Sequence, residues 1–179
     1  ILIGFKIEEI GKEYVAYTIN DDNLSNTVTV LISEIDYDND IPKIVELETE
    51  LLLETLGSEM LQAELHNQYA HFFCAKDENE PIGYIGCWII EGTCDMINFV
   101  VQKDYQRMGV GSSLFNKVLE QCRKENATEI LLEVRASNIP AISFYKKFGF
   151  QQIATRKQYY KNKEDACILR KDLYENLSN

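Results

Sequence analysis

Residues 106–111 read Q-R-M-G-V-G and have the composition of an anion-binding turn. An apolar segment at 96–101 precedes them, and a segment with helical spacing at 112–124 follows. The two glycines let the backbone approach a ligand closely, because neither carries a Cβ. The first amides of the new helix have no partner inside the helix, so they favour phosphate or pyrophosphate. The residues predicted to bind this ligand are Gln106, Arg107, Met108, Gly109, Val110, Gly111 and Ser112.

The spacing of these glycines excludes two common nucleotide-binding loops. The chain contains neither G-x-x-x-x-G-K-[ST] nor G-x-G-x-x-G. A bare G-x-G also fits a plain tight turn, and the arginine before it favours the phosphate site. Because the net charge is −11, a polyanionic ligand needs a local group of amides and cations. Lys103, Arg107 and Arg135 are the candidate cations.

Two downstream segments complete a pattern with this loop: L-L-E-V-R-A-S-N at 131–138 and A-I-S-F-Y-K-K-F-G-F at 141–150. In this order and spacing, the chain resembles the GCN5-related N-acetyltransferase (GNAT) superfamily. Within it, the chain is most similar to the bacterial ribosomal-protein-alanine N-acetyltransferases and their archaeal N-terminal acetyltransferase relatives. The resemblance implies an α+β fold, with helices flanking a central mixed, mostly antiparallel sheet. It also implies acyltransferase activity with acetyl-CoA as the cofactor.

Glu133 is the candidate general base. It lies at the end of an apolar strand, where a mixed sheet opens a ligand crevice. An α-amine has a pKa near 8, against about 10.4 for lysine, so a carboxylate acting through water suffices for an α-amine. The residues alone fit an ion pair with Arg135 equally well. The resemblance implies that Glu133 is the base and contacts the substrate.

Tyr145 is the candidate general acid, since a phenol can give a proton to a departing thiolate. The residues alone favour a core tyrosine instead, in an aromatic cluster with Phe144 and Phe148. The resemblance implies that Tyr145 is the acid and also contacts the cofactor.

Asn138 is predicted to cap a helix, and the resemblance implies that it also contacts the pantetheine arm of the cofactor. The resemblance further implies that the backbone of residues 98–101 pairs with this arm like an added strand and supplies an oxyanion donor. Phe99, Val100 and Val101 are therefore predicted cofactor contacts, and Asn98 is a predicted substrate contact.

Tyr159 and Tyr160, followed by E-D-A at 164–166, resemble the Y-Y…E-D-A segment of the ribosomal-protein subfamily. The resemblance implies that both tyrosines lie beside the acceptor peptide. Two exposed loop aromatics are the alternative reading. Lys161 stands where the family often has proline, which leaves the fine shape of the groove open.

The elements expected to hold these residues form one domain at 34–175, behind an N-terminal strand extension at 1–33. The extension is read as strands at 1–7, 14–19 and 27–32, with Gly11 in one turn and a polar turn at 21–26. Pro42 and a capping Asp40 predict a helix start, and Ser58 predicts a second helix to about Gln68. Strands are expected at 69–76, 83–90, 94–102, 129–134, 150–155 and 166–170, and helices at 112–124 and from Pro140 to Gly149.

Composition limits the classes of partner. The chain has 179 residues, of which 45% are apolar, so it fits one globular domain. The negative charge argues against nucleic acid and favours a basic partner, such as the N-terminal peptide of a ribosomal protein. No apolar run is long enough for a bilayer, and no signal peptide is evident. We expect a cytoplasmic monomer or weak dimer.

Cysteine and histidine usage gives no sign of a metal site. The five cysteines are odd in number, lack C-x-x-C spacing and mostly fall in apolar segments, which indicates reduced, buried thiols. His66 and His71 lie five residues apart, a poor spacing for a ligand pair on a helix or a strand.

Three functions fit these observations. The first is acetyl transfer from acetyl-CoA to the N-terminal α-amine of a protein, in particular a ribosomal protein starting with Ala. The second is a lysine or small-amine acetyltransferase of the same superfamily. The third is an acyl-CoA-binding sensor without catalysis, which the extra N-terminal strands would suit.

Overall fold

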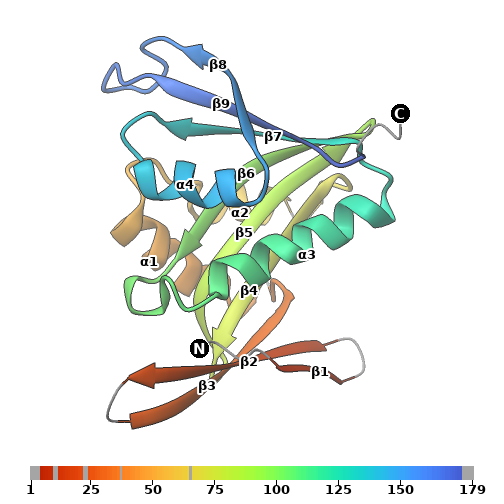
Figure 1. Ribbon diagram of the computed structural model, residues 1–179, viewed down its shortest axis with the longest axis vertical. Coiled ribbons are helices and arrows are strands. Elements are labelled where there is room, and N and C mark those ends of the chain that lie inside the picture. The colour runs from red at the N-terminus through yellow and green to blue at the C-terminus, as the bar shows by residue number, and fades with distance from the viewer. Residues whose placement is uncertain (1–4, 10–11, 22–23, 37, 65, 175–179) are drawn as a thin grey trace. The chain divides into compact units, whose positions relative to one another are not determined.

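The computed structural model describes residues 5–9, 12–21, 24–36, 38–64 and 66–174 (Figure 1). The chain divides into two compact units. The first unit comprises residues 1–87 and 98–121, and the second comprises 88–97 and 122–179. Strands β5 (Glu80–Ile90) and β6 (Thr93–Val101) and helix α3 (Val110–Lys124) each contribute residues to both units.

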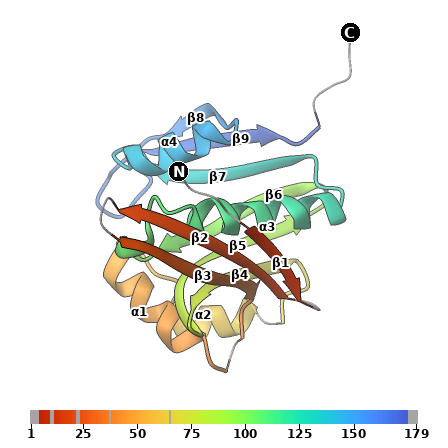
Figure 2. The ribbon, with the colours of Figure 1, turned by 60° about the horizontal axis from the view of Figure 1, so that its bottom comes forward.

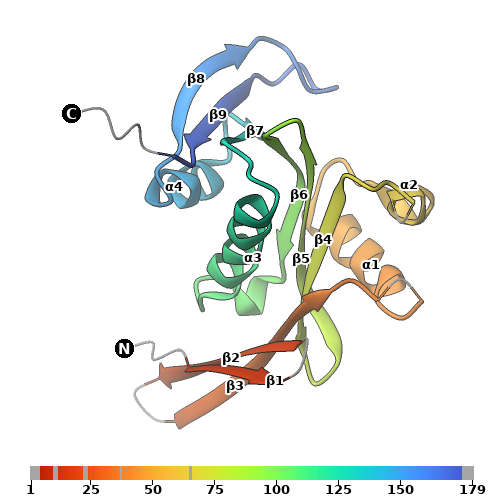
Figure 3. The same ribbon diagram turned by 90° about the vertical axis from the view of Figure 1, so that its right-hand side faces the viewer.

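The first unit is built on strands in the order β1-β2-β3-β4-β5-β6. Strands β1 (Phe5–Glu9), β2 (Lys12–Asp21), β3 (Leu24–Glu34) and β4 (Ala70–Asp77) pair antiparallel with one another in this order (Figure 2). Helices α1 (Ile41–Leu51) and α2 (Gly57–Glu64) lie on one face of β4 and β5, and α3 lies on the opposite face (Figure 3).

Close packing of the first unit depends on two glycines of β5. A Cβ at Gly86 would lie 2.3 Å from the ring of Phe72, and one at Gly83 would lie 2.7 Å from the carbonyl oxygen of Val100. These positions therefore exclude larger residues, because side chain and backbone already fill the space. Apolar residues from several elements form the buried core, including Val30, Ile32, Ile44, Leu47, Ile85, Leu114, Phe115 and Val118.

Strands β2 and β3 are longer than the sequence predicts. The polar turn expected at 21–26 is largely strand, because Asn20 pairs with Ser25 and Asp21 with Leu24 in the β2–β3 ladder. Backbone pairing overrides the polar side chains there. The strand expected at 1–7 is described only from Phe5, and Gly11 lies outside the described residues. The division into an extension at 1–33 and a domain at 34–175 stays a prediction, and its boundary falls within β3.

Helix α1 begins where the sequence predicts, but Asp40 does not cap it as expected. Asp40 is the residue before the helix, but its carboxylate makes no capping hydrogen bond. The carboxylate is buried, accepts a hydrogen bond from the Asp36 amide at 2.8 Å and pairs with Lys76 at 2.7 Å. A tertiary cation therefore engages the group that the local pattern assigned to the cap. Helix α2 also ends at Glu64, earlier than the expected Gln68.

The second unit is built on strands in the order β5-β6-β7-β9-β8. Strand β7 (Glu129–Arg135) pairs parallel with β6 and antiparallel with β9 (Ala166–Asp172), and β8 (Gln151–Arg156) pairs antiparallel with β9. Helix α4 (Ile139–Lys147) follows β7. The predicted mixed, mostly antiparallel sheet with flanking helices is confirmed.

Two local predictions in the second unit are confirmed. Asn138 caps α4, because its side-chain oxygen accepts a hydrogen bond from the Ala141 amide at 3.2 Å. Pro140 lies in the first turn, and Gly149 follows the helix with a φ of +87°.

The five cysteines of both units are free and buried, as predicted. Within the described residues, no helix combines the length and the apolar character needed to cross a membrane.

Candidate functional site

The predicted anion loop lies between β6 and α3 in the first unit. A short 3₁₀ helix, η1 (Lys103–Tyr105), leads into it, and α3 begins at Val110. Gly109 has a φ of +91° and Arg107 a φ of +62°, so the turn uses the left-handed conformation that glycine permits. The glycines and the arginine are thus at the start of a helix, where the sequence predicted them.

Neighbouring side chains fix the conformation of this loop. Gln106 donates a side-chain hydrogen bond to the carbonyl oxygen of Val101 at 2.8 Å. The Tyr105 hydroxyl donates to the Asp77 carboxylate at 2.7 Å, and this bond raises the pKa of Tyr105 to about 12. Lys103, a candidate cation, is exposed and lies 3.7 Å from Glu50.

The predicted pantetheine-binding segment is the last part of β6, also in the first unit. The side-chain oxygen of Asn98 accepts a hydrogen bond from the Phe99 amide at 3.1 Å. The amide nitrogen of the same side chain donates to Glu48 at 2.7 Å. Val100 is buried, and Phe99 and Val101 are half-buried. The side chain of Asn98 therefore fixes the backbone of β6 at Phe99 and links it to Glu48.

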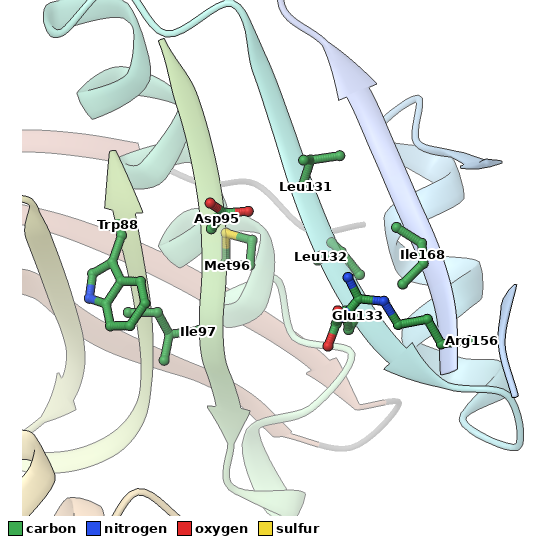
Figure 4. Close-up of a pocket in the computed structure, with 9 residues that line it drawn as sticks. All are labelled: Trp88, Asp95, Met96, Ile97, Leu131, Leu132, Glu133, Arg156 and Ile168. Atoms are coloured by element: carbon green, nitrogen blue, oxygen red, sulfur yellow. Dashed lines mark hydrogen bonds and ion pairs between the residues drawn. The ribbon is translucent and has the colours of Figure 1, made fainter. Parts of the chain in front are cut away.

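A cavity of about 280 Å³ opens in the second unit, where β6 and β7 diverge (Figure 4). The parallel pairs between the two strands run from Thr93 and Glu129 to Asp95 and Leu131. The cavity begins where that register ends. Its lining residues are Trp88, Asp95, Met96, Ile97, Leu131, Leu132, Glu133, Arg156 and Ile168.

Glu133 lies in the wall of this cavity, and its side chain is 30% exposed. It forms an ion pair with Arg156 (Figure 4). A hydrogen bond to Glu133 raises the pKa of Tyr159, with burial as a smaller cause. Burial first, and then the charges of Glu129 and Glu133, raise the pKa of Asp95. The carboxylate of Glu133 is thus reachable from solvent and has polar neighbours in Arg156 and Tyr159.

Tyr145 is packed in an aromatic cluster, as the residues alone favoured. Its ring meets Phe144 and Phe150 edge-on, with centroids 5.4 and 5.3 Å apart, and the residue is 7% exposed. Burial raises the pKa of its phenol. The phenol therefore keeps its proton at neutral pH, and the role of general acid stays a prediction.

Tyr159 and Tyr160 lie in the loop between β8 and β9 and stack against arginines. The guanidinium of Arg135 lies 3.7 Å from the ring centre of Tyr160, and that of Arg156 lies 5.4 Å from the ring centre of Tyr159. The two tyrosine rings meet edge-on at 5.2 Å. Tyr159 is 46% exposed, so the pair presents an aromatic surface. The guanidinium groups of Arg135 and Arg156 hold the two rings in place.

Glu164 anchors this loop to the start of α4. Its carboxylate accepts hydrogen bonds from the hydroxyl and the amide of Ser137 at 2.6 and 3.0 Å, and from Arg135 at 3.1 Å. The bonds from Ser137 are the main reason that the pKa of Glu164 is lowered to about 2. Asp165 does similar work by accepting from Lys157 and from the Gln158 amide, at 2.7 and 2.9 Å. The E-D pair of the motif thus shapes the loop.

Sequence reasoning missed four residues: Arg156, Trp88, Asp95 and Glu48. Arg156, the ion partner of Glu133, lies 23 residues away on another strand, and nothing in the local pattern marks it. Trp88 and Asp95 line the cavity without belonging to any motif. Glu48 was detectable, because it interrupts the apolar face of α1 next to Leu47. In the described part of the chain, no cluster of His, Cys, Asp or Glu side chains could hold a metal ion.

Comparisons with known proteins agree on a family. Residues 41–150 match the model of the Acetyltransferase (GNAT) family. A Bacillus subtilis protein assigned as a ribosomal protein bS18-alanine N-acetyltransferase is 35% identical over 132 residues, which cover 73% of this chain and 87% of that protein. An N-alpha-acetyltransferase of Sulfurisphaera tokodaii is 30% identical over 143 residues, covering 73% of this chain and 86% of its own.

A solved structure extends the comparison. Naa50 from Arabidopsis thaliana, in complex with the bisubstrate analogue CoA-Ac-MVNAL, has a TM-score of 0.70 and 28% identity to this chain. The match covers 80% of this chain and 98% of that one.

Proposed function

Because this chain belongs to the GNAT acetyltransferase family, we propose that it acetylates the N-terminal α-amine of a ribosomal protein that starts with alanine. The chain is an acetyl-CoA-dependent N-acetyltransferase of the N-alpha type. The observation that carries the catalytic proposal is the carboxylate of Glu133 in the wall of a cavity, beside Tyr159 and Arg156. The choice of a ribosomal acceptor is supported by the Bacillus subtilis relative and by the net charge of −11.

The proposed chemistry needs a base, an acid and a cofactor site. Acetyl-CoA supplies the acetyl group as a thioester. Glu133 takes a proton from the α-amine through water, and Tyr145 holds a proton for the departing thiolate. Burial of Tyr145 keeps that proton in place at neutral pH. The acceptor amine must be neutral, which favours an α-amine over lysine near pH 7.

The anion loop suits the pyrophosphate of the cofactor. Gly109 and the start of α3 offer backbone amides, and Arg107 adds a cation. We assign the contacts of the loop to Gln106, Arg107, Met108, Gly109, Val110, Gly111 and Ser112, those of the strand to Phe99, Val100 and Val101, and a further contact to Asn138. On the acceptor side we assign Asn98, Tyr159 and Tyr160.

A peptide panel tests the proposal. Peptides with a free α-amine that start with Ala, Ser, Gly or Met are compared with α-blocked peptides that carry an internal lysine, and transfer from acetyl-CoA is read by mass spectrometry. Each sequence is made with a basic and an acidic tail. We expect transfer only to free N-termini, greatest for Ala with a basic tail.

Other outcomes would point elsewhere. Transfer to lysine alone would indicate a side-chain acetyltransferase. Binding of acetyl-CoA without transfer to any amine would indicate a sensor. Reactions without enzyme measure the background acetylation.

A further inference from the structure

Helix α1 carries a carboxylate where an amphipathic helix would place an apolar residue. Glu48 is 0% exposed and follows Leu47, which is 2% exposed, on the buried face of the helix. A buried carboxylate is costly unless its oxygens accept hydrogen bonds. Glu48 therefore needs a set of donors, and the structure supplies four.

All four donors are uncharged, and all lie in the first unit. The amides of Leu56 and Gly57 donate to the two carboxylate oxygens at 3.3 and 3.0 Å. The side chain of Asn98 donates at 2.7 Å, and the Tyr84 hydroxyl donates as well. Burial, with the hydrogen bond to Glu48 as the second cause, raises the pKa of Tyr84, so Tyr84 stays a donor.

These bonds join three parts of the first unit. Leu56 is the last residue of the connection between α1 and α2, and Gly57 is the first residue of α2. Tyr84 belongs to β5, and Asn98 belongs to β6. Asn98 also links Glu48 to the backbone of β6, because its side-chain oxygen accepts a hydrogen bond from the Phe99 amide at 3.1 Å. One carboxylate thus sets the position of the α1–α2 turn and of the backbone at Phe99.

We propose that Glu48 is a positioning residue for acetyl transfer, which holds the β6 backbone at Phe99 for the thioester through Asn98. Its role rests on the proposed function, in which residues 98–101 bind the pantetheine arm and supply the oxyanion donor. Small displacements of such groups lower rates strongly, because catalysis depends on their placement. Glu48 is 0% exposed, so it acts through Asn98 rather than on the substrate itself.

The test compares Glu48→Gln with Glu46→Gln, an exposed glutamate of the same helix that pairs with Lys43. We expect kcat per folded molecule to fall about 10- to 100-fold in Glu48→Gln, and to stay at the wild-type value in the control. Folded fractions come from circular dichroism. Tyr84→Phe, which removes one of four donors, keeps the test valid if Glu48→Gln does not fold; its kcat should fall in the same direction by a smaller factor.

Binding gives a second readout that does not require turnover. Glu48→Gln should weaken acetyl-CoA binding about 3- to 10-fold in calorimetry, and should leave binding of adenosine 3′,5′-bisphosphate unchanged, because the nucleotide uses the loop rather than β6. If wild type binds acetyl-CoA but acetylates no peptide, the proposed function fails while this readout still tests Glu48. Rates and affinities that change only with the folded fraction would reduce Glu48 to a structural residue and overturn the proposal.

Discussion

Glu48 and Glu133 carry the same functional group and are held in opposite ways. The carboxylate of Glu48 is fully buried and accepts hydrogen bonds from four uncharged donors, two of which are backbone amides. The side chain of Glu133 is 30% exposed, lines a cavity and pairs with Arg156, whose own side chain is 58% exposed.

The contrast suits the two carboxylates to different tasks: Glu48 to holding the backbone in position, and Glu133 to the proposed transfer of a proton. Two of the donors to Glu48 are backbone amides, so that carboxylate suits the task of holding backbone in place. An exposed ion pair contributes little to stability and exchanges its partners readily. Glu133 can therefore change its contacts during a reaction without loosening the fold.

The largest expected effect tests this separation directly. Glu133→Gln should lower kcat/KM about 100-fold or more, because an amide cannot accept the proton. Its free energy of unfolding should change by less than about 1 kcal/mol, because the ion pair with Arg156 is partly exposed and the amide of Gln can still accept the hydrogen bond from Tyr159. Glu48→Gln should lower the free energy of unfolding by about 2 kcal/mol, because a buried acceptor is replaced. Urea denaturation and steady-state kinetics on both variants would decide; unchanged turnover in Glu133→Gln would reject its assignment as base.

The next effect concerns the pH dependence of the rate. We expect kcat/KM to rise up to about pH 8, about tenfold per unit at low pH, as the acceptor α-amine loses its proton. A group with a raised pKa stays protonated to higher pH, so the loss of rate due to Tyr145 should lie above pH 10. Initial rates on a stable peptide, with Tyr145→Phe as the control, measure this. A fall between pH 8 and 9 that disappears in Tyr145→Phe would contradict the burial of the acid.

The smallest effect concerns Glu164, a carboxylate in a surface network. Glu164→Gln should raise KM for the peptide about threefold with little change in kcat, because the loop that carries Tyr159 and Tyr160 loses its anchor. Hydrogen exchange of residues 157–165 should increase, and Asp172→Asn, which alters another exposed pair, provides the control. Wild-type exchange in Glu164→Gln would show that the other loop contacts suffice.

The same network has its own pH dependence. The pKa of Glu164 is lowered to about 2 from 4.5, so its stabilising contribution is complete above pH 4.5 and is lost as the pH falls towards 2. Protection of the loop should therefore persist at pH 4. Loss of protection between pH 6 and 5 would assign the anchor to another group.

The sequence predicted elements whose signals are local. Asn138, Pro140 and Gly149 delimit α4 as expected, because capping and helix termination depend on neighbouring residues. The glycines of the anion loop begin a helix for the same reason. The order of the remaining strands and helices followed from alternating turn residues and apolar segments.

The local sequence pattern could not predict which side chains from distant elements would pair. Asp40 was assigned to a cap, but Lys76 and the Asp36 amide engage its carboxylate. Arg135 was weighed as the partner of Glu133, yet it pairs with Glu164, and Arg156 pairs with Glu133. Such pairs depend on which strands become neighbours in the sheet, and the spacing of residues along the chain does not determine this.

Under the proposed function, Arg107 would stabilise the bound cofactor at a cost to the stability of the unliganded fold. Its φ of +62° is one that glycine adopts freely, and a side chain there costs about 1 kcal/mol. Arg107→Gly should therefore leave the unliganded fold equally or more stable while weakening its affinity for coenzyme A, which thermal melting with and without the ligand would reveal. Selection for melting temperature alone would discard this arginine, whereas selection for turnover at low cofactor concentration would keep it.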